Sequence, residues 1–118
     1  PKVNREDPIY CDPEMKQAAE KILTDYRLKL GKQGNLTEEE KAAALYEAVK
    51  IDGGLGIEMD TDFASRKQGC RTAQEVFAQK NAKGKRYAHP NEAVYLLVAL
   101  ARAVGLDAVI LDGHQKMI

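Results

Sequence analysis

The longest apolar stretch of the chain predicts a buried helix over about residues 90–104. A surface helix has one apolar stripe at positions i, i+3, i+4 and i+7, whereas here apolar side chains occupy nearly every side. Beyond the first turn, Arg102 is the only charged residue of the run. Pro90 suits a first helical turn, Glu92 places negative charge near the positive end of the helix dipole, and Gly105 suits a left-handed C-terminal cap. The remaining elements are therefore expected to pack around this central helix.

A first amphipathic helix is expected to begin after Asp12 and to end near Gly31. Asp12 is a good N-cap, and Pro13 has the fixed φ of a first helical position. The apolar positions of this segment recur at helical spacing and form one stripe: Met15, Ala18, Ala19, Ile22, Leu23 and Tyr26.

Two further helices are predicted by capping boxes. The Thr37 hydroxyl can accept from the Glu40 amide while the Glu40 carboxylate accepts from the Thr37 amide, and Thr72 and Glu75 repeat this arrangement. The helix that begins at Thr72 is expected to stop by about Asn81.

Residues 53–68 are expected to form a long loop with one short extended piece, because they have no sustained period and three glycines in their first four positions. Loops of this length inside compact domains are often functional. Glu58, Asp60 and Asp62 resemble the spacing of a calcium loop, but the glycine and glutamate that complete such a loop do not follow. We therefore expect neither a metal site nor a cofactor.

The chain ends in a predicted β-hairpin, because Asp112 and Gly113 form a type I′ turn signal between apolar-containing runs. Residues 108–111 and 115–118 should pair as antiparallel strands, which makes the fold class α+β. Two strands alone are marginal in water. Either the chain is a fragment, or another segment or a second chain completes the sheet, in which case self-association through the sheet edge is expected.

The composition fits one globular domain over residues 1–118, in which 1–35 hold an extended lead and the first helix. The 18 basic and 18 acidic residues balance, which argues against nucleic-acid binding. A local basic cluster is interpreted as a solvated loop; its members are Lys80, Lys83, Lys85 and Arg86. The apolar run over 90–104 is too short to span a bilayer, so no membrane insertion is expected.

The two cysteines leave the compartment open. Cys11 and Cys70 can form one disulfide in an exported protein or remain thiols in a cytosolic one. Cys70 also lies directly before a capped helix, where a thiolate would be stabilised. A reactive thiol, a disulfide with Cys11 and an ordinary thiol all remain open for Cys70.

The order of these elements resembles the bacterial transglutaminase-like superfamily, whose members share a papain-like core. The resemblance covers residues 36–114, about two thirds of the chain. It is most specific in NEAVYLLVALARAVGLDAVIL, which is similar to the family's helix pattern C-x-E-x-A-x-L-x-x-A-L-A-R-x-x-G-I-x-A-x. The same order places Gly113 and His114 where the family has its histidine.

The resemblance implies a cysteine thiolate at the start of the central helix, a histidine on a following strand, and an acid or amide after it. A helix N-terminus lowers a thiol's pKa and stabilises an oxyanion, while the histidine takes the proton. Pro90 stands at the nucleophile's position, with no nucleophilic group and no backbone N–H. His114 matches the histidine, as a vestigial or real catalytic residue or as an ordinary hairpin residue. The third member would fall beyond Ile118.

The expected function is that of a catalytically degenerate transglutaminase-like domain that binds a protein or peptide by strand pairing in the remaining cleft. Expected ligand contacts surround the start of the central helix: Tyr87, His89, Asn91 and Glu92. His89 is otherwise a helix cap or a loop residue, and Glu92 otherwise a helix-start charge. One alternative is an active cysteine peptidase, amidase or acyltransferase that uses Cys70 with His114 or His89. Another is a helical protein-interaction domain unrelated to transglutaminases.

Overall fold

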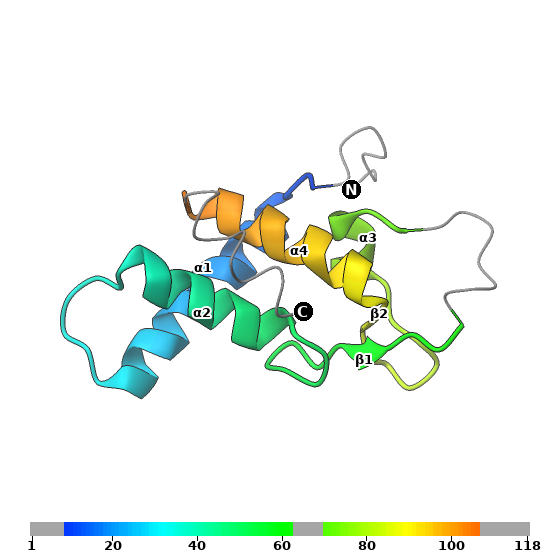
Figure 1. Ribbon diagram of the computed structural model, residues 1–118, viewed down its shortest axis with the longest axis horizontal. Coiled ribbons are helices and arrows are strands. Elements are labelled where there is room, and N and C mark those ends of the chain that lie inside the picture. Colours follow the sequence, from blue (N-terminus) through cyan, green and yellow to red (C-terminus); the bar gives the residue numbers. More distant parts are fainter. Residues whose placement is uncertain (1–8, 63–69, 107–118) are drawn as a thin grey trace.

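The computed structural model describes residues 9–62 and 70–106. The hairpin expected over 108–118, His114 included, lies outside these residues. Within them the chain is an α+β domain with four helices and a two-stranded parallel sheet (Figure 1). Across the described ranges, none of the helices is both long enough and apolar enough to cross a membrane.

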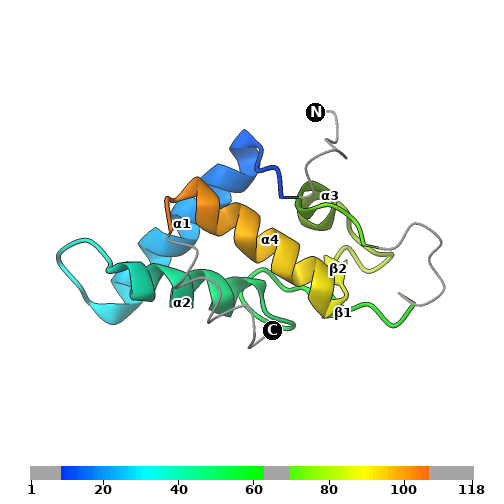
Figure 2. The same cartoon turned by 45° about the horizontal axis from the view of Figure 1, so that its top comes forward.

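Helix α4 (Pro90–Ala103) forms the centre of the domain, as its apolar sequence predicts. It contacts α1, α2, α3 and β2, and Figures 1 and 2 show it running between the other helices. Its buried positions include Leu96, Leu97 and Leu100. Each such leucine contributes about 1.5–3 kcal/mol through removal of its side chain from water. After the helix, Gly105 adopts a φ of 76°, the left-handed conformation expected of a C-terminal glycine.

Helix α1 (Pro13–Leu30) has the predicted boundaries. The Asp12 carboxylate accepts a 2.9 Å hydrogen bond from the Met15 N–H. At the other end Gly31 has a φ of 67°, which a glycine adopts without the steric cost of a side chain. The helix buries Met15 and Ala19 toward the core.

Both predicted capping boxes are present, at the starts of α2 (Glu38–Val49) and α3 (Ala73–Ala78). Helix α2 ends before the glycine pair, where the chain turns back onto the helix. A Cβ at Gly53 would lie 2.2 Å from the Glu47 carbonyl oxygen, so this turn requires glycine. Helix α3 ends at Ala78, in agreement with the expectation that it stops by about Asn81.

The two-stranded sheet of the described chain is an addition to the expected elements, and the hairpin expected over 108–118 stays a prediction because it lies outside the described residues. Strands β1 (Glu58–Met59) and β2 (Tyr87–Ala88) pair in parallel, and both precede α4. Strand β1 is the short extended piece expected within 53–68, whereas the segment that contains β2 was expected to be a polar loop. Two-residue strands are too short to show a period of two, which is why β2 has no sequence signal.

Candidate functional site

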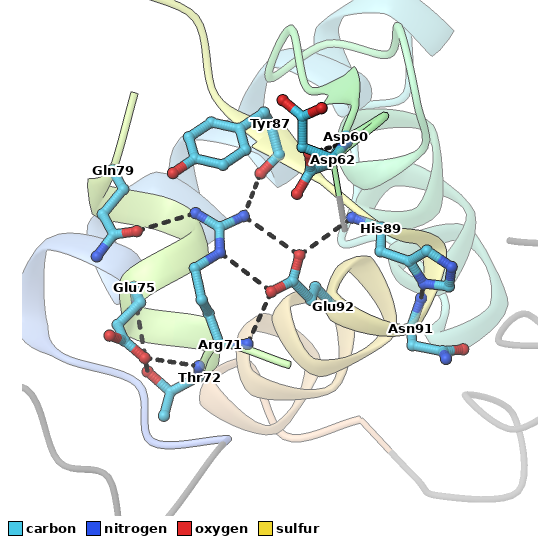
Figure 3. A network of polar contacts seen from close by, with 10 residues as sticks. All are labelled: Asp60, Asp62, Arg71, Thr72, Glu75, Gln79, Tyr87, His89, Asn91 and Glu92. Carbon is cyan, nitrogen blue, oxygen red and sulfur yellow. Dashed lines mark hydrogen bonds and ion pairs between the residues drawn. The ribbon is translucent and has the colours of Figure 1, made fainter. Parts of the chain in front are cut away.

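The start of α4 is the place where the resemblance puts a nucleophile, and it is closed by the chain's own groups (Figure 3). Pro90 is the first helical residue and has no N–H to donate. The Asn91 N–H donates to Nδ1 of His89 at 3.1 Å, so His89 is the N-cap of this helix. The next two amides, of Glu92 and Ala93, donate to the His89 carbonyl at 2.9 and 3.0 Å. The amides that could hold an anion here are thus missing or already bonded.

Directly behind this helix start lies a buried ion pair between Arg71 and Glu92. Arg71 Nε is 3.0 Å from Glu92 Oε2, and the two side chains are 2% and 0% exposed. The backbone N–H of Arg71 donates to the same oxygen at 2.7 Å. The His89 N–H donates to the other oxygen, Oε1, at 3.1 Å. Glu92 therefore completes a capping box and anchors residue 71 to α4 at the same time.

Each of the three nitrogens of the Arg71 guanidinium donates to a neighbouring residue. Its Nη1 donates to Gln79 Oε1 at 3.0 Å and its Nη2 donates to the Tyr87 carbonyl oxygen. The guanidinium carbon also lies 4.1 Å from the centre of the Tyr87 ring. Figure 3 shows this one side chain linking α3, β2 and α4. Sequence reasoning missed Arg71, because a single charge next to a helix start has no periodic signal and its partner is 21 residues away.

Burial changes the interpretation of one of the expected ligand contacts, Glu92. Glu92 has no exposed surface, so it can act on a ligand only through the residues that it positions. Asn91 is exposed, whereas His89 and Tyr87 are half-buried. The structure brings His89, Glu92 and Tyr87 into one network through Arg71, and places Asn91 at its outer edge.

The cysteines lie before two different helices, Cys11 before α1 and Cys70 before α3. Both are thiols rather than halves of a disulfide. Burial raises the pKa of the Cys11 thiol, and the neighbouring Asp12 charge raises it further, while Lys16 opposes them. Cys70 precedes Arg71 and so lies one residue from the α4 network. A pairing of Cys70 with His114 falls outside the described residues.

A cleft of about 430 Å³ lies beside this network, along β1 and the loop that leads to β2. It is lined by Glu58, Met59, Asp60, Thr61, Asp62, Asn81, Ala82, Lys83 and Tyr87. Tyr87, one of the expected contact residues, thus lines this cleft. In the chain that the structure describes, no group of three or more His, Cys, Asp or Glu side chains is placed to hold a metal ion.

The two outer edges of the sheet differ, because Arg71 bonds to the outer edge of β2 but not to that of β1. The N–H of Glu58 donates to the carbonyl of Arg86, directly before β2, and the N–H of Asp60 donates to the carbonyl of Ala88 on β2. Successive residues of a strand direct their backbone groups to opposite sides, so Met59 directs its N–H and C=O away from β2. On the far side of β2, Arg71 occupies the Tyr87 carbonyl. The edge of β1 at Met59, a residue that is 48% exposed, is the edge that Arg71 does not close.

Comparison of the chain with protein-family models, with curated proteins and with solved structures finds no match. The likeness to transglutaminase-like proteins therefore stays a prediction from residues 36–114. The geometry of the described residues carries the functional argument.

Proposed function

We propose that this chain is a catalytically degenerate transglutaminase-like domain that binds an extended segment of a peptide or protein along β1. The observation that carries the proposal is the combination of a closed α4 start with an accessible strand edge beside a cleft. Neither feature requires the protein to perform a reaction.

Acyl transfer at the start of α4 lacks both of its requirements. The reaction needs an atom that attacks and donors that hold the oxyanion. Pro90 provides neither, and the following amides donate to His89. The carboxylate of Glu92, which could otherwise move a proton, is held in the buried pair with Arg71. This network supports a structural role for the residues around the nucleophile's position.

Peptide binding by strand addition is supported by the backbone of β1. In this mode an extended chain adds to a sheet edge, main-chain hydrogen bonds give affinity, and nearby pockets select side chains. Met59 supplies the outward N–H and C=O, and the 430 Å³ cleft begins at the same residue. A short edge gives few hydrogen bonds, so side-chain contacts in the cleft must contribute much of the affinity.

A peptide array tests this proposal. The full chain is applied to immobilised 12-residue peptides of random sequence, and each peptide that binds is synthesised again with alternate backbone nitrogens methylated. Strand addition predicts that methylation in one of the two registers abolishes binding, because it removes the donors that face β1. Binding that survives both methylation patterns, or no binding at all, would overturn the proposal.

The alternative of an active cysteine enzyme has one observation in its favour, the place of Cys70 next to a helix start and to the α4 network. Iodoacetamide labelling near neutral pH, read by peptide mass spectrometry, separates the two functions. An activated thiolate at Cys70 would react much faster than free cysteine. The binding function predicts a rate no higher than that of free cysteine.

A further inference from the structure

We infer that the segment bound along β1 carries a large apolar side chain, such as that of leucine, in register with Met59. This inference rests on the proposed function and names the chemistry of the partner. It follows from the face of the sheet on which Met59 lies and from the residues next to it on that face.

Met59 lies on the face of the sheet that is directed to the core. Residues paired across a sheet direct their side chains to the same face, and Met59 pairs with Ala88. Ala88 is 0% exposed and belongs to the hydrophobic core. Ile57, two residues before Met59, is also fully buried in that core, as the alternation of an extended chain predicts for the same face. Met59 thus has core residues beside it, both along its own chain and across the sheet.

The apolar layer of this face ends at Met59, which is 48% exposed. Figures 1 and 2 both place β2 between α3 and β1, so β1 is the outer strand of the described sheet. Single exposed apolar residues are common on protein surfaces and need no partner. Met59 differs from the exposed Leu28 on α1, because it continues a buried layer at a strand edge whose backbone N–H and C=O point outward.

An added strand would extend this layer by one position. The residue that pairs with Met59 directs its side chain to the face of Met59 and Ala88. A large apolar side chain there removes its own surface and that of Met59 from water. A carboxylate at the same position would lose its water next to apolar side chains, which is unfavourable.

The two neighbours of that residue in the segment point to the opposite face, where Glu58 and Tyr87 lie. This face is polar, because the Glu58 carboxylate accepts a 3.0 Å hydrogen bond from Asn81 and lies 3.8 Å from the Lys85 ammonium. The partner is therefore expected to have one large apolar residue between two polar ones.

Three capped heptapeptides of threonine, with leucine, alanine or aspartate at the centre, test the inference by calorimetric titration of the full chain. Threonine favours extended strands, and only the central residue differs among the peptides. The leucine peptide should bind about tenfold more tightly than the alanine peptide, because leucine buries more apolar surface. The aspartate peptide should bind most weakly.

Variants of Met59 locate the apolar contact. Met59→Ser should lower the ratio of leucine to alanine affinity to about threefold or less, because it removes the surface that leucine covers. Met59→Phe should raise the affinity for the leucine peptide, since aromatic and aliphatic side chains pair favourably across strands. A gain in affinity cannot arise from a misfolded protein. Leu28→Ser is the matched control, because it removes an apolar side chain of α1 that is 69% exposed, and should leave the ratio unchanged.

The outcomes separate the two proposals. Equal affinity of the leucine and alanine peptides, or a leucine preference that Met59→Ser leaves intact, would overturn the inferred apolar residue at Met59. Failure of the three heptapeptides would do the same if peptides on the array bind in one methylation-sensitive register, and strand addition would then stand. Failure of every peptide to bind, on the array and in solution, would overturn the proposed function and this inference together.

Discussion

At the scale of single residues, Glu92 acquires its role from its surroundings. A glutamate at the third position of a helix is an ordinary helix-start charge, and the sequence predicts that much. The structure adds Arg71, which turns the same carboxylate into one half of a fully buried ion pair. Burial of both charges costs desolvation energy, which the hydrogen bonds to the backbone of Arg71 and His89 help to offset.

Glu92→Gln should destabilise the domain by about 3–5 kcal/mol, because it leaves the Arg71 guanidinium buried without a compensating charge. Urea denaturation followed by circular dichroism measures the change. Glu20→Gln, on the exposed side of α1, is the matched control and should shift the free energy of unfolding by less than about 0.5 kcal/mol. A Glu92→Gln variant as stable as the control would show that the pair is not the anchor described here.

The raised pKa of the Cys11 thiol predicts that the stability of the folded protein depends on pH. Its pKa is raised in the folded protein, mainly by burial, so the unfolded chain releases the thiol proton at lower pH than the folded chain. The stabilising contribution of the neutral thiol is thus complete below the unfolded pKa of about 8.5 and is lost as pH rises through the folded pKa. Relative to Cys11→Ser, the wild-type protein should lose stability between neutral and alkaline pH in urea titrations. A difference that does not change with pH would exclude this effect.

At the scale of elements, local signals decide where helices start and end. The Thr37 and Thr72 capping boxes and the caps of α1 involve residues only a few positions apart, so the sequence alone places these boundaries well. His89 is likewise a helix cap that acts over a few positions, since its Nδ1 accepts from the Asn91 N–H. Histidine is not among the preferred caps, so the sequence leaves its role open between a cap and a loop residue.

Loss of the His89 cap should destabilise α4. His89→Ala removes the acceptor of the Asn91 N–H and should cost about 1 kcal/mol, whereas His89→Asn should retain the stability, because asparagine is a preferred cap. Thermal unfolding of the two variants beside the wild-type protein measures both effects. Equal stability of His89→Ala and His89→Asn would mean that this cap does not hold the helix start.

Contacts between distant residues limit what the sequence can predict. The pairing of Glu58 with Tyr87, and the bond from Arg71 to Glu92, join segments more than twenty residues apart and leave no local pattern. The candidate site consists of such contacts. For this reason the buried helix and the proline at its start were predictable, whereas the parallel sheet, the cleft and Arg71 were not.

At the scale of the whole molecule, the described chain separates a closed region from an accessible one. The start of α4 is closed by His89, Pro90 and the Arg71–Glu92 pair, and the same Arg71 also closes the outer edge of β2. Arg71 does not close the edge of β1, and this edge with the cleft beside it is the surface where we expect a partner to bind. No reaction is expected at the start of α4.

Hydrogen exchange of the Met59 backbone amide, followed by NMR with and without a saturating amount of a peptide that binds on the array, tests the central claim most directly. Strand addition predicts that the peptide slows exchange at Met59 at least tenfold, because its N–H gains a partner, and leaves exchange unchanged at Leu28 on the far helix α1. Unchanged exchange at Met59 with the peptide bound, or protection confined to the α1 and α2 side, would contradict binding at the edge of β1.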